Sequence, residues 1–455
     1  MRMRPHAIEI PYRDPVSAFT PFAANPYSAF LDAPGDEGRY AYIAPAPVAV
    51  EIAEVGDTDN PWDRLAERLA EFQLCPLEHL PPFQTGLVGY FGYEMGRHLE
   101  QLPAPHITGT ELPEMVVGFY DVIAAFDVER KKSWVVASPF SNHSSDQTKD
   151  RAETLAREIA AAPTEIAEPE IEVEQWQPEI ARTEYDAKAK GIIDYIQAGD
   201  IFQANLTQRF LAERPARLAP FDLYRQLRHL NPAPFAAYLG CGSGRAVLSA
   251  SPERFLSLGT DRRVVTEPIK GSRPRGATAE ADRDLAKALE NSAKDKAENL
   301  MIVDLLRNDL SRVCEIGSVA VPSLNRLESF AEMHHLVSTV TGTLKPDETA
   351  ISLLKACFPG GSVTGAPKIR AMEIINEIEP ARRGPYCGAI GWIGFDGAMD
   401  TSIVIRTLVV EENQIIAQAG GGIVADSQPT LEYEESMSKA RALLRCLDPK
   451  NQSGL

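Results

Sequence analysis

The sequence predicts an α+β protein. Strand-like and helix-like segments follow one another without the regular strand–helix–strand alternation that a doubly wound parallel sheet requires. With 455 residues, of which 44% are hydrophobic and 24% charged, the chain has an ordinary globular composition. It can bury a large core without metal ions or disulfides. At about 100–200 residues per domain, this length allows two to four domains or one large one.

The N-terminal region, residues 1–165, is predicted to consist mainly of short strands. Its strand-like runs are separated by Pro- and Gly-rich turns, and they lie at 41–53, 115–129 and 133–138. A helix is expected over 151–161. The stretch that follows, 166–182, is acidic and interrupted by prolines, which is typical of a solvated linker on the surface.

The C-terminal region, residues 183–450, carries longer periodic patterns. A helix is expected from Thr183 to near Gly199, and a last helix from about Pro429 to Leu447. Between them the patterns predict two neighbouring strands, then one long or two consecutive helices, then three strands of an antiparallel meander. These segments are 246–258 and 262–271, 281–312, and 388–395, 402–411 and 413–424.

The charge balance makes nucleic-acid binding improbable. The chain has 46 Lys plus Arg against 64 Asp plus Glu, a formal charge of −18, and no basic block longer than three residues. Non-specific nucleic-acid binding depends on clustered cations, so no nucleic-acid partner is expected. An anionic ligand would need a local basic pocket.

Cysteine usage and hydropathy indicate a cytoplasmic protein. The six cysteines are irregularly spaced and form no CxxC pair, which disfavours a zinc site or a disulfide framework and favours reduced thiols. The N-terminus lacks the apolar core of a signal peptide. No run of 18 apolar residues is present, so no membrane span is expected.

Lys270 lies in EPIKGSRPRG, at a strand end followed by a Gly/Pro loop with two arginines. Nearby cations and partial burial lower the pKa of a lysine and favour the free amine, which is a nucleophile. Glu253 lies in SPERF, at the end of an apolar run. A carboxyl group shielded from water has a raised pKa and can act as a general acid. Alone, each pattern more often marks a surface lysine or a salt-bridged glutamate.

Two acidic helices could hold Mg²⁺. Asp295 and Glu298 share one helix face because they are three residues apart, as do Glu432 and Glu435 on the last helix. Mg²⁺ binds through one or two carboxylates and keeps waters or substrate oxygens. The ordinary alternative is acidic residues that stabilise a helix start or form ion pairs.

Two glycine loops could receive an anion. In FPGGSVTGAPK, Gly360 and Gly365 have the spacing of a P-loop, but Ala366 stands where lysine is required, which disfavours nucleotide binding. Backbone N–H groups before the following helix could still bind an anion. Gly420, Gly421 and Gly422 would allow a ligand close to the backbone, or they form a tight turn.

Nine segments, in order, resemble the chorismate-utilising enzymes, the family of anthranilate synthase component I, aminodeoxychorismate synthase component I, and isochorismate and salicylate synthases. They are AGDIFQANLTQRF, SASPERFL, EPIKGSRPRG, AENLMIVDLLRNDLSRV, HHLVSTVTG, FPGGSVTGAPKIRAMEII, RRGPYCGAIGWIG, IRTL and AGGGIVADSQPTLEYEESMSKA. The N-terminal PFQTGLVGYFGYE is also similar. The resemblance implies two packed, mainly antiparallel sheets flanked by helices, in which both regions share one β-sandwich core.

Within this family, the residue at position 270 separates activities. Lysine there implies formation of 4-amino-4-deoxychorismate, towards p-aminobenzoate and folate, through a covalent Lys270 intermediate, whereas anthranilate synthases typically carry alanine. The family's water-using members place a lysine base where this chain has Gln203. Anthranilate synthase component I is the alternative activity, and a non-catalytic chorismate- or tryptophan-binding protein is a remote one.

The resemblance also implies the roles of individual residues. Glu253 would be the general acid. Mg²⁺ would be held by Glu298 and Glu435, with Glu432 and Asp295 as outer or water-mediated ligands. Chorismate would contact, besides Gln203, the following residues: Gly420, Gly421, Gly422 and Lys439 at its ring carboxylate, Tyr386 and Arg406 at its enolpyruvyl carboxylate, and His335 and Ser362 near C4.

Two partners besides chorismate follow from the resemblance. No glutaminase segment is recognisable around the cysteines, so a separate glutamine amidotransferase subunit is expected to supply ammonia. The family's N-terminal half can also hold tryptophan. Here FLDAP (Phe30 to Pro34) and NPAPF (Asn231 to Phe235) resemble the two sides of that pocket, and Ala33 stands where serine is common.

Overall fold

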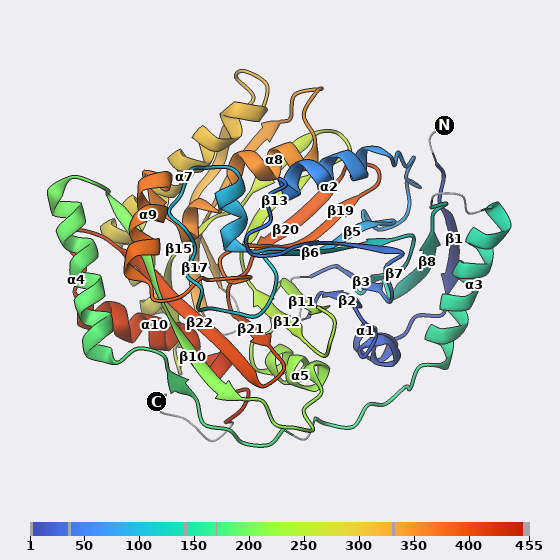
Figure 1. Ribbon diagram of the computed structural model, residues 1–455, viewed down its shortest axis with the longest axis horizontal. Helices are drawn as coiled ribbons and strands as arrows, with labels where there is room; N and C mark the ends of the chain where they lie inside the picture. Colours follow the sequence, from blue (N-terminus) through green and yellow to red (C-terminus); the bar gives the residue numbers. More distant parts are fainter. Residues whose placement is uncertain (1–2, 35–37, 141–143, 170, 330–332, 449–455) are drawn as a thin grey trace.

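The computed structural model describes all residues except 1–2, 35–37, 141–143, 170, 330–332 and 449–455. Two large, mainly antiparallel sheets pack face to face, and helices cover their outer sides (Figure 1). The α+β class and the two-sheet architecture are therefore confirmed. Both sheets mix strands from the first 140 residues with strands from the last 260.

The first sheet has 12 strands. Along its path they are β1 (His6–Ile10), β8 (Lys132–Ala137), β7 (Val122–Asp127), β3 (Tyr40–Ala44), β2 (Ala29–Asp32), β11 (Phe235–Gly240), β12 (Ala246–Ser251), β21 (Thr407–Val410), β22 (Gln414–Ile423), β10 (Gln203–Glu213) and β18 (Gly365–Ala366), with β9 (Gln177–Pro178) beside β10.

The second sheet has ten strands. They are β15 (Ile269–Pro274), β17 (Met333–Thr343), β14 (Arg263–Thr266), β13 (Arg254–Leu258), β20 (Met399–Ile403), β19 (Ala389–Gly394), β5 (Gly86–Phe91), β6 (Met115–Tyr120) and β4 (Ala49–Ala53), with β16 (Ala320–Ser329) beside β17.

The core lies in layers. Alternate side chains of both sheets meet between them, as where the rings of Tyr42 on β3 and Trp392 on β19 lie 6.4 Å apart. The outer face of the 12-stranded sheet is covered by four helices, α1 (Pro15–Phe19), α3 (Ser145–Ala161), α5 (Pro220–Leu230) and α10 (Pro429–Leu444). The outer face of the ten-stranded sheet is covered by α2 (Pro61–Ala70), α7 (Ala293–Val313) and α8 (Ala350–Cys357).

Two further helices pack together against β10. Buried apolar side chains of α4 (Arg182–Ala198) and α9 (Lys368–Ile378) pack together against β10. α4 ends where Gly199 adopts a φ of 86°, a left-handed conformation that glycine adopts readily. The stretch 281–312 forms two helices, because Ser292 caps the start of α7 after α6 (Ala279–Glu290) has ended. The short helices are η1 (Thr20–Phe22), η2 (Tyr93–His98) and η3 (Gly361–Val363).

The predicted three-stranded meander is wrong. The segment 402–411 divides between the sheets: β20 pairs with β19 in the ten-stranded sheet, and β21 pairs with β22 in the 12-stranded one. The chain crosses between them at Val404–Arg406, where Arg406 has a φ of 53°. The segment 246–258 crosses in the same way at Pro252–Glu253, between β12 and β13. Alternating apolar residues do not specify the sheet to which a strand belongs, so neither crossing can be predicted from the hydrophobic pattern.

The two crossings are hydrogen-bonded to each other. The Ile403 amide donates to the Glu253 carbonyl (3.0 Å), and the Ala250 amide donates to the Arg406 carbonyl (3.1 Å). Glu253 and Arg406 are thereby held at one point of the seam between the sheets.

The acidic stretch 166–182 is mostly exposed, yet it is anchored at two places. The Trp176 indole is buried and donates a hydrogen bond to the Leu444 carbonyl (2.8 Å), and Ile180 is buried against α4 and β10.

The six cysteines are unpaired, and five of them are buried. Within the described residues, none of the helices combines the length and apolar character needed to pass through a bilayer.

Candidate active site

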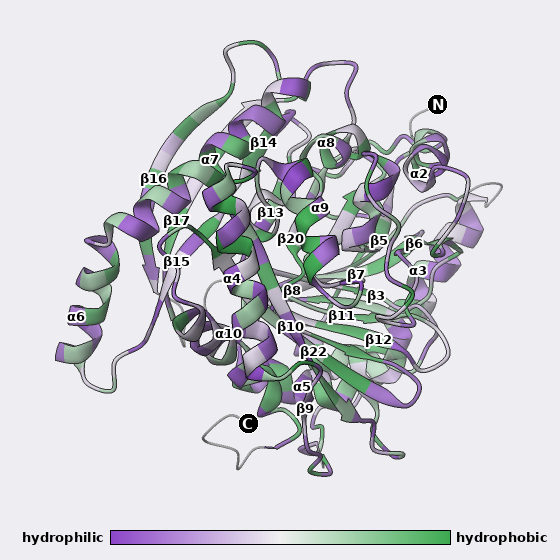
Figure 2. Cartoon of the chain, turned by 60° about the vertical axis from the view of Figure 1, so that its left-hand side comes forward, coloured by the Kyte–Doolittle hydropathy of each residue, from purple (hydrophilic) through white to green (hydrophobic). Residues whose placement is uncertain are grey.

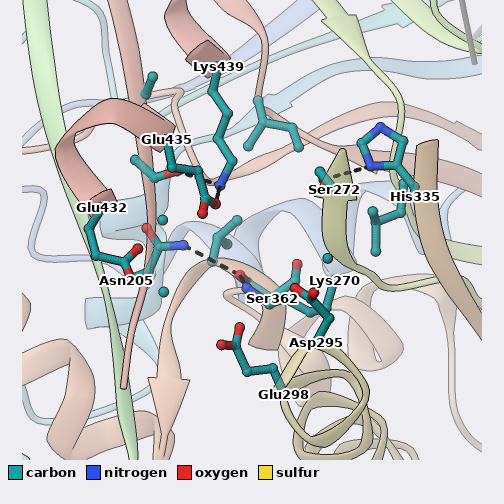
Figure 3. Close-up of a pocket in the computed structure, with 18 of the residues that line it drawn as sticks. Asn205, Lys270, Ser272, Asp295, Glu298, His335, Ser362, Glu432, Glu435 and Lys439 are labelled. Atoms are coloured by element: carbon teal, nitrogen blue, oxygen red, sulfur yellow. Dashed lines mark hydrogen bonds and ion pairs between the residues drawn. The ribbon is translucent and has the colours of Figure 1, made fainter. Parts of the chain in front are cut away.

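A cavity of about 420 Å³ opens at the end of the sandwich, between the edges of the two sheets and helices α7 and α10 (Figure 3). It brings together nearly all of the residues singled out in the sequence: Glu253, Lys270, Asp295, Glu298, His335, Ser362, Tyr386, Arg406, Gly420, Gly421, Gly422, Glu432, Glu435 and Lys439 all line it. Segments almost 190 residues apart in the chain therefore form one site.

Lys270 extends into this cavity from β15. The register between β15 and β17 shifts at the next residue, where Gly271 has a φ of 78°. Lys270 Nζ donates to the Ser362 carbonyl oxygen at 2.6 Å. Burial lowers the pKa of Lys270, while the carboxylate of Glu298 acts in the opposite direction. The side chain is thus an amine held inside a cavity, with a reduced cost of losing its proton.

Glu253 lies on the crossing between β12 and β13 and is 4% exposed. Burial raises the pKa of its carboxyl group, although a hydrogen bond with the Ser362 side chain and the charge of Lys270 oppose this shift. The Ile269 amide donates to Glu253 Oε1 at 3.3 Å. A buried carboxyl group with a raised pKa retains its proton more readily and can give it to a leaving group.

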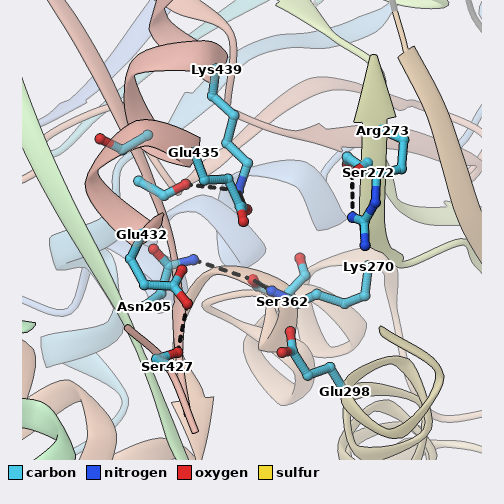
Figure 4. A network of polar contacts seen from close by, with 12 residues as sticks. Asn205, Lys270, Ser272, Arg273, Glu298, Ser362, Ser427, Glu432, Glu435 and Lys439 are labelled. Carbon is cyan, nitrogen blue, oxygen red and sulfur yellow. Dashed lines mark hydrogen bonds and ion pairs between the residues drawn. The ribbon is translucent and has the colours of Figure 1, made fainter. Parts of the chain in front are cut away.

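Three glutamates face one another across the cavity (Figure 4). Glu435 is paired with Lys439 at 2.6 Å, which lowers the pKa of Glu435 to about 2. Glu432 accepts a hydrogen bond from Ser427 Oγ at 2.6 Å and lies 3.5 Å from Lys294. Across from them, burial raises the pKa of Glu298 on α7, and Asp295 and Glu435 add to that shift.

These carboxylates form an incomplete set of ligands. In the described part of the chain, no three His, Cys, Asp or Glu side chains converge closely enough to hold a metal ion by themselves. Mg²⁺ fits such a set because it binds one or two carboxylates and takes its remaining oxygens from water or substrate. Glu298 suits this role, because burial disfavours its charge and a cation would offset that cost. Asp295 suits it less well, because its carboxylate accepts a hydrogen bond from Arg273 at 2.9 Å.

The predicted glycine loop is wrong, as is its alternative of a tight turn: Gly420–Gly422 lie within β22 beside these glutamates and pair with residues 205–207 of β10. A side chain on Gly421 would point at Glu435, Lys439 and Glu432, whose nearest atoms lie 3.5–3.8 Å from its Cβ position. On the two neighbouring glycines a Cβ would collide with β10, at 2.1 Å from the Leu206 carbonyl oxygen and 2.0 Å from Gln203 Nε2. Lys439 Nζ also donates to the Gly420 carbonyl at 3.0 Å. The strand therefore leaves open backbone at Gly421 next to a lysine, which suits a carboxylate ligand.

The other side of the cavity carries Tyr386, Arg406 and His335. The Arg406 guanidinium donates to the Lys439 carbonyl, and burial lowers its pKa. Burial also raises the pKa of Tyr386 well above its usual value, so its hydroxyl stays protonated. His335 Nδ1 lies 2.8 Å from Ser272 Oγ, and burial together with the charges of Arg406 and Lys439 lowers the pKa of His335 to about 3. His335 is therefore a neutral imidazole at physiological pH.

Two further predicted features differ from the structure. Gln203 is buried behind Gly422 and is not among the residues that line the cavity. The backbone amides of the loop before α9 are predicted to bind an anion. In the structure this loop instead contacts a cation, because the Ser362 carbonyl accepts a hydrogen bond from Lys270.

Asn205 lines the cavity but escaped the reading of the sequence. It is 7% exposed, its Nδ2 lies 3.5 Å from the Ser362 carbonyl, and its Oδ1 is buried without a hydrogen-bond partner. Residues i and i+2 of a strand share a face, so its position two residues after Gln203 is the signal that could have revealed it.

A second cavity, of about 330 Å³, lies where FLDAP and NPAPF come together, because Asp32 on β2 pairs with Ala236 on β11. Asp32 is buried, and its Oδ2 accepts hydrogen bonds from Arg228 Nε (2.5 Å) and the Tyr224 hydroxyl (3.0 Å). Trp392 forms part of the wall of this second cavity.

Comparisons with known proteins agree with this geometry. Residues 27–445 match the family described as chorismate binding enzyme. The chain is 41% identical to aminodeoxychorismate synthase component 1 of Klebsiella aerogenes, over 98% of this chain and 100% of that protein. It is 39% identical to anthranilate synthase component 1 of Streptomyces coelicolor, over 94% of this chain and 86% of that protein.

A solved structure gives the same result. The crystal structure of anthranilate synthase component I from Streptococcus pneumoniae superposes with a TM-score of 0.80 at 34% identity, covering 90% of this chain and 93% of that one. Relatives of this identity and coverage, together with a cavity that combines carboxylates, cations and open backbone at a glycine, establish the class of protein. The chain belongs to the chorismate binding enzyme family.

Proposed function

We propose that the chain is component I of an aminodeoxychorismate synthase. In this proposal it converts chorismate and ammonia to 4-amino-4-deoxychorismate and water, on the route to p-aminobenzoate and folate, through a covalent bond to Lys270. The observation that carries the proposal is the position of Lys270 Nζ, inside the cavity between the two carboxylate-bearing helices.

The residues around Lys270 support a double displacement. The Lys270 amine attacks C2 of the ring, both ring double bonds shift (from C1=C2 and C5=C6 to C1=C6 and C4=C5), and the C4 hydroxyl leaves as water with a proton from Glu253. Ammonia then attacks C4, both double bonds shift back, and Lys270 leaves from C2. A proton from the new ammonium group returns to Glu253, so that chorismate and ammonia are consumed and 4-amino-4-deoxychorismate and water are formed.

The remaining residues bind and orient the substrate. Open backbone at Gly421 and the ammonium group of Lys439 suit the ring carboxylate. Tyr386 and Arg406, on the opposite side, suit the enolpyruvyl carboxylate, to which a guanidinium can donate two parallel hydrogen bonds. In this proposal His335, as a neutral ring, and Ser362, which both line the cavity, hydrogen-bond the group at C4.

Mg²⁺ is the cation that this site would take. Glu298 and Glu435 would hold it, with Glu432 nearby, and the bound ion would neutralise the ring carboxylate and withdraw electron density from the diene. Lys294 and Lys439 lie near the same glutamates in the structure, so both ammonium groups would move or share the site when the ion binds.

Intact-protein mass spectrometry tests the proposal. Incubation with chorismate and Mg²⁺, without ammonia, should add the mass of chorismate less one water. Lys270→Ala should show no adduct. Lys296→Ala is the control: it removes an exposed lysine of α7, and this variant should still form the adduct. An adduct that persists in Lys270→Ala would remove Lys270 from the proposed role.

Anthranilate synthase component I is the second candidate, because curated relatives of that name match nearly as well. The two activities differ in product. Incubation with chorismate, Mg²⁺ and ammonium salt should give no fluorescent anthranilate from this chain, and a lyase that removes pyruvate from the product should release 4-aminobenzoate. Anthranilate formed by the chain alone would establish the second candidate.

A further inference from the structure

Asn205 brings an unused hydrogen-bond acceptor into the catalytic cavity. It lies near the start of β10, which runs beside β22 (Figure 2). Asn205 lines the cavity and is 7% exposed, yet its Oδ1 has no hydrogen-bond partner among the described residues. Burying an acceptor without a donor is costly, and folded proteins mostly avoid it. An acceptor kept in this state inside a reaction cavity indicates a donor that arrives with the substrates.

The contacts of Asn205 fix the direction in which this acceptor points. The backbone amide of Asn205 donates to the Thr364 carbonyl (2.8 Å), and its backbone carbonyl accepts a hydrogen bond from Arg383 at 2.7 Å. In the side chain, Nδ2 lies 3.5 Å from the Ser362 carbonyl oxygen. An amide oxygen in that place would face another acceptor. The nitrogen therefore faces Ser362, and Oδ1 is the free end of the amide.

The reacting groups of the proposed function surround the same Ser362. Lys270 Nζ donates to the Ser362 carbonyl at 2.6 Å, and the Ser362 side chain hydrogen-bonds the Glu253 carboxyl group. Figure 4 shows Asn205 and Lys270 approaching the Ser362 carbonyl from two sides. The free acceptor of Asn205 is therefore a neighbour of both the nucleophile and the proton donor.

Ammonia is the substrate to which the proposed function assigns no binding group. It attacks C4 through its single lone pair, so its N–H groups have to point away from C4 and towards acceptors. A neutral amide oxygen suits this task, because a carboxylate would favour the ammonium ion, which has no lone pair. When Lys270 bonds to C2, its amine no longer occupies the Ser362 carbonyl. Two neutral acceptors, that carbonyl and Asn205 Oδ1, are then available together.

We propose that Asn205 Oδ1 and the Ser362 carbonyl bind ammonia and direct its lone pair at C4. This inference rests on the proposed function and assigns a site to its second substrate. In the step concerned, the lone pair forms the C4–N bond, both ring double bonds shift back, and the C2–Nζ bond breaks with its electron pair on Lys270. The new ammonium group then gives a proton to Glu253.

The same contact favours the transition state of this step. The attacking nitrogen gains positive charge as its lone pair forms the bond, and a hydrogen bond from a charged donor is stronger than one from a neutral donor. Both acceptors therefore bind the nitrogen more tightly in the transition state than in free ammonia. Loss of one acceptor should affect the use of ammonia and spare the earlier attack of Lys270 on chorismate.

Asn205→Leu tests the ammonia site, because leucine has a similar shape and no acceptor. Rapid quenching and intact-protein mass spectrometry follow two steps separately: formation of the Lys270 adduct from chorismate and Mg²⁺, and loss of the adduct after ammonium salt is added. The variant should form the adduct at the rate of the unaltered chain. The ammonium concentration that gives half the maximal rate of adduct loss should rise about tenfold or more.

A second variant and a matched control accompany this measurement. Asn205→Ala also removes the acceptor without placing a larger apolar group in the cavity, and it should show the same pattern. Ser28→Ala is the control: it too removes a buried oxygen that lacks a partner in the described part of the chain, and Ser28 is not among the residues that line the catalytic cavity. The control should alter neither step.

The outcomes separate this inference from the proposed function. An unchanged half-saturating ammonium concentration in both Asn205 variants would overturn the ammonia site. Adduct formation slowed tenfold in both variants would also overturn it, because the acceptor would then serve chorismate itself. Absence of any adduct in the unaltered chain would instead overturn the proposed function.

Discussion

The two cavities of this molecule differ in how completely their charged side chains are paired. In the second cavity each charged side chain is matched by a partner: Asp32 by Arg228, Arg39 by Asp127, and Arg254 by Asp400. In the catalytic cavity, Lys270 donates to a neutral carbonyl, Glu298 has only a lysine at 4.0 Å, and Asn205 Oδ1 has no partner. Charges that are already paired stabilise the fold, whereas buried charges without close partners remain available to a ligand. Substitutions in the catalytic cavity should therefore reduce the catalytic rate, and substitutions in the second cavity should reduce the stability of the fold.

Removing the amine should have the largest effect. Lys270→Ala is expected to reduce formation of 4-amino-4-deoxychorismate by about 10⁴-fold or more, as the loss of a covalent nucleophile does in other enzymes. The rate is measured with ammonium salt and Mg²⁺ under saturating chorismate. The melting temperature should not fall, because Lys270 is a buried cation whose charge is disfavoured by burial. A residual rate within tenfold of the unaltered chain would contradict the covalent mechanism.

Removing the general acid should have the next largest effect. Glu253→Gln preserves shape and removes the proton donor, so the maximal rate should fall by about 10²–10⁴-fold. The substrate concentration at half-maximal rate should change little, since the loss falls on the departure of the C4 hydroxyl. The matched control is Glu267→Gln, which alters a half-buried carboxylate that pairs with Arg254 nearby. Equal rates for both variants would remove Glu253 from its role.

Breaking the ion pair of the second cavity should affect stability and leave the rate unchanged. Asp32→Asn is expected to lower the free energy of unfolding by about 1–3 kcal/mol, because the Arg228 guanidinium loses a charged acceptor. Asp222→Asn is the control: it breaks a partly exposed pair with Arg225 on α5, the helix that also carries Arg228, and such a pair is worth about 0–1 kcal/mol. Denaturant titration gives both values. A lower catalytic rate in Asp32→Asn, measured where the variant is still fully folded, would contradict this prediction and indicate that the two cavities are coupled.

The pH dependence of stability should reveal His335. Its pKa is about 3 in the folded chain against 6.5 ordinarily, so below pH 6.5 the unfolded chain binds a proton that the folded chain does not. Stability should therefore fall with decreasing pH from about 6.5 towards 3, by at most about 1.4 kcal/mol per pH unit from this group. His335→Asn should reduce that slope when the free energy of unfolding is measured between pH 7 and 5. An unchanged slope would contradict burial of a neutral ring.

Helix ends and motifs could be predicted from the sequence, because their signals are local. Gly199 ends α4 and Pro429 starts α10 at the expected positions, and the segments that resemble the family contain nearly every residue of the cavity. The assignment of strands to sheets could not be predicted, since both sheets contain buried, alternating strands. The pairing of Asp295 with Arg273 and the burial of Gln203 behind Gly422 depend on contacts between distant segments, which no spacing in the chain reports.

The paired crossings at Glu253 and Arg406 make catalysis sensitive to the mutual alignment of the two sheets. Lys270 belongs to the ten-stranded sheet, whereas Gly421, whose open backbone suits the ring carboxylate, belongs to the 12-stranded one. A small slide of one sheet over the other would thus move the nucleophile relative to its target carbon, and the two hydrogen bonds between the crossings resist that slide. Loosened packing between the sheets, for instance around Tyr42 and Trp392, should therefore slow turnover at temperatures where the protein is still folded.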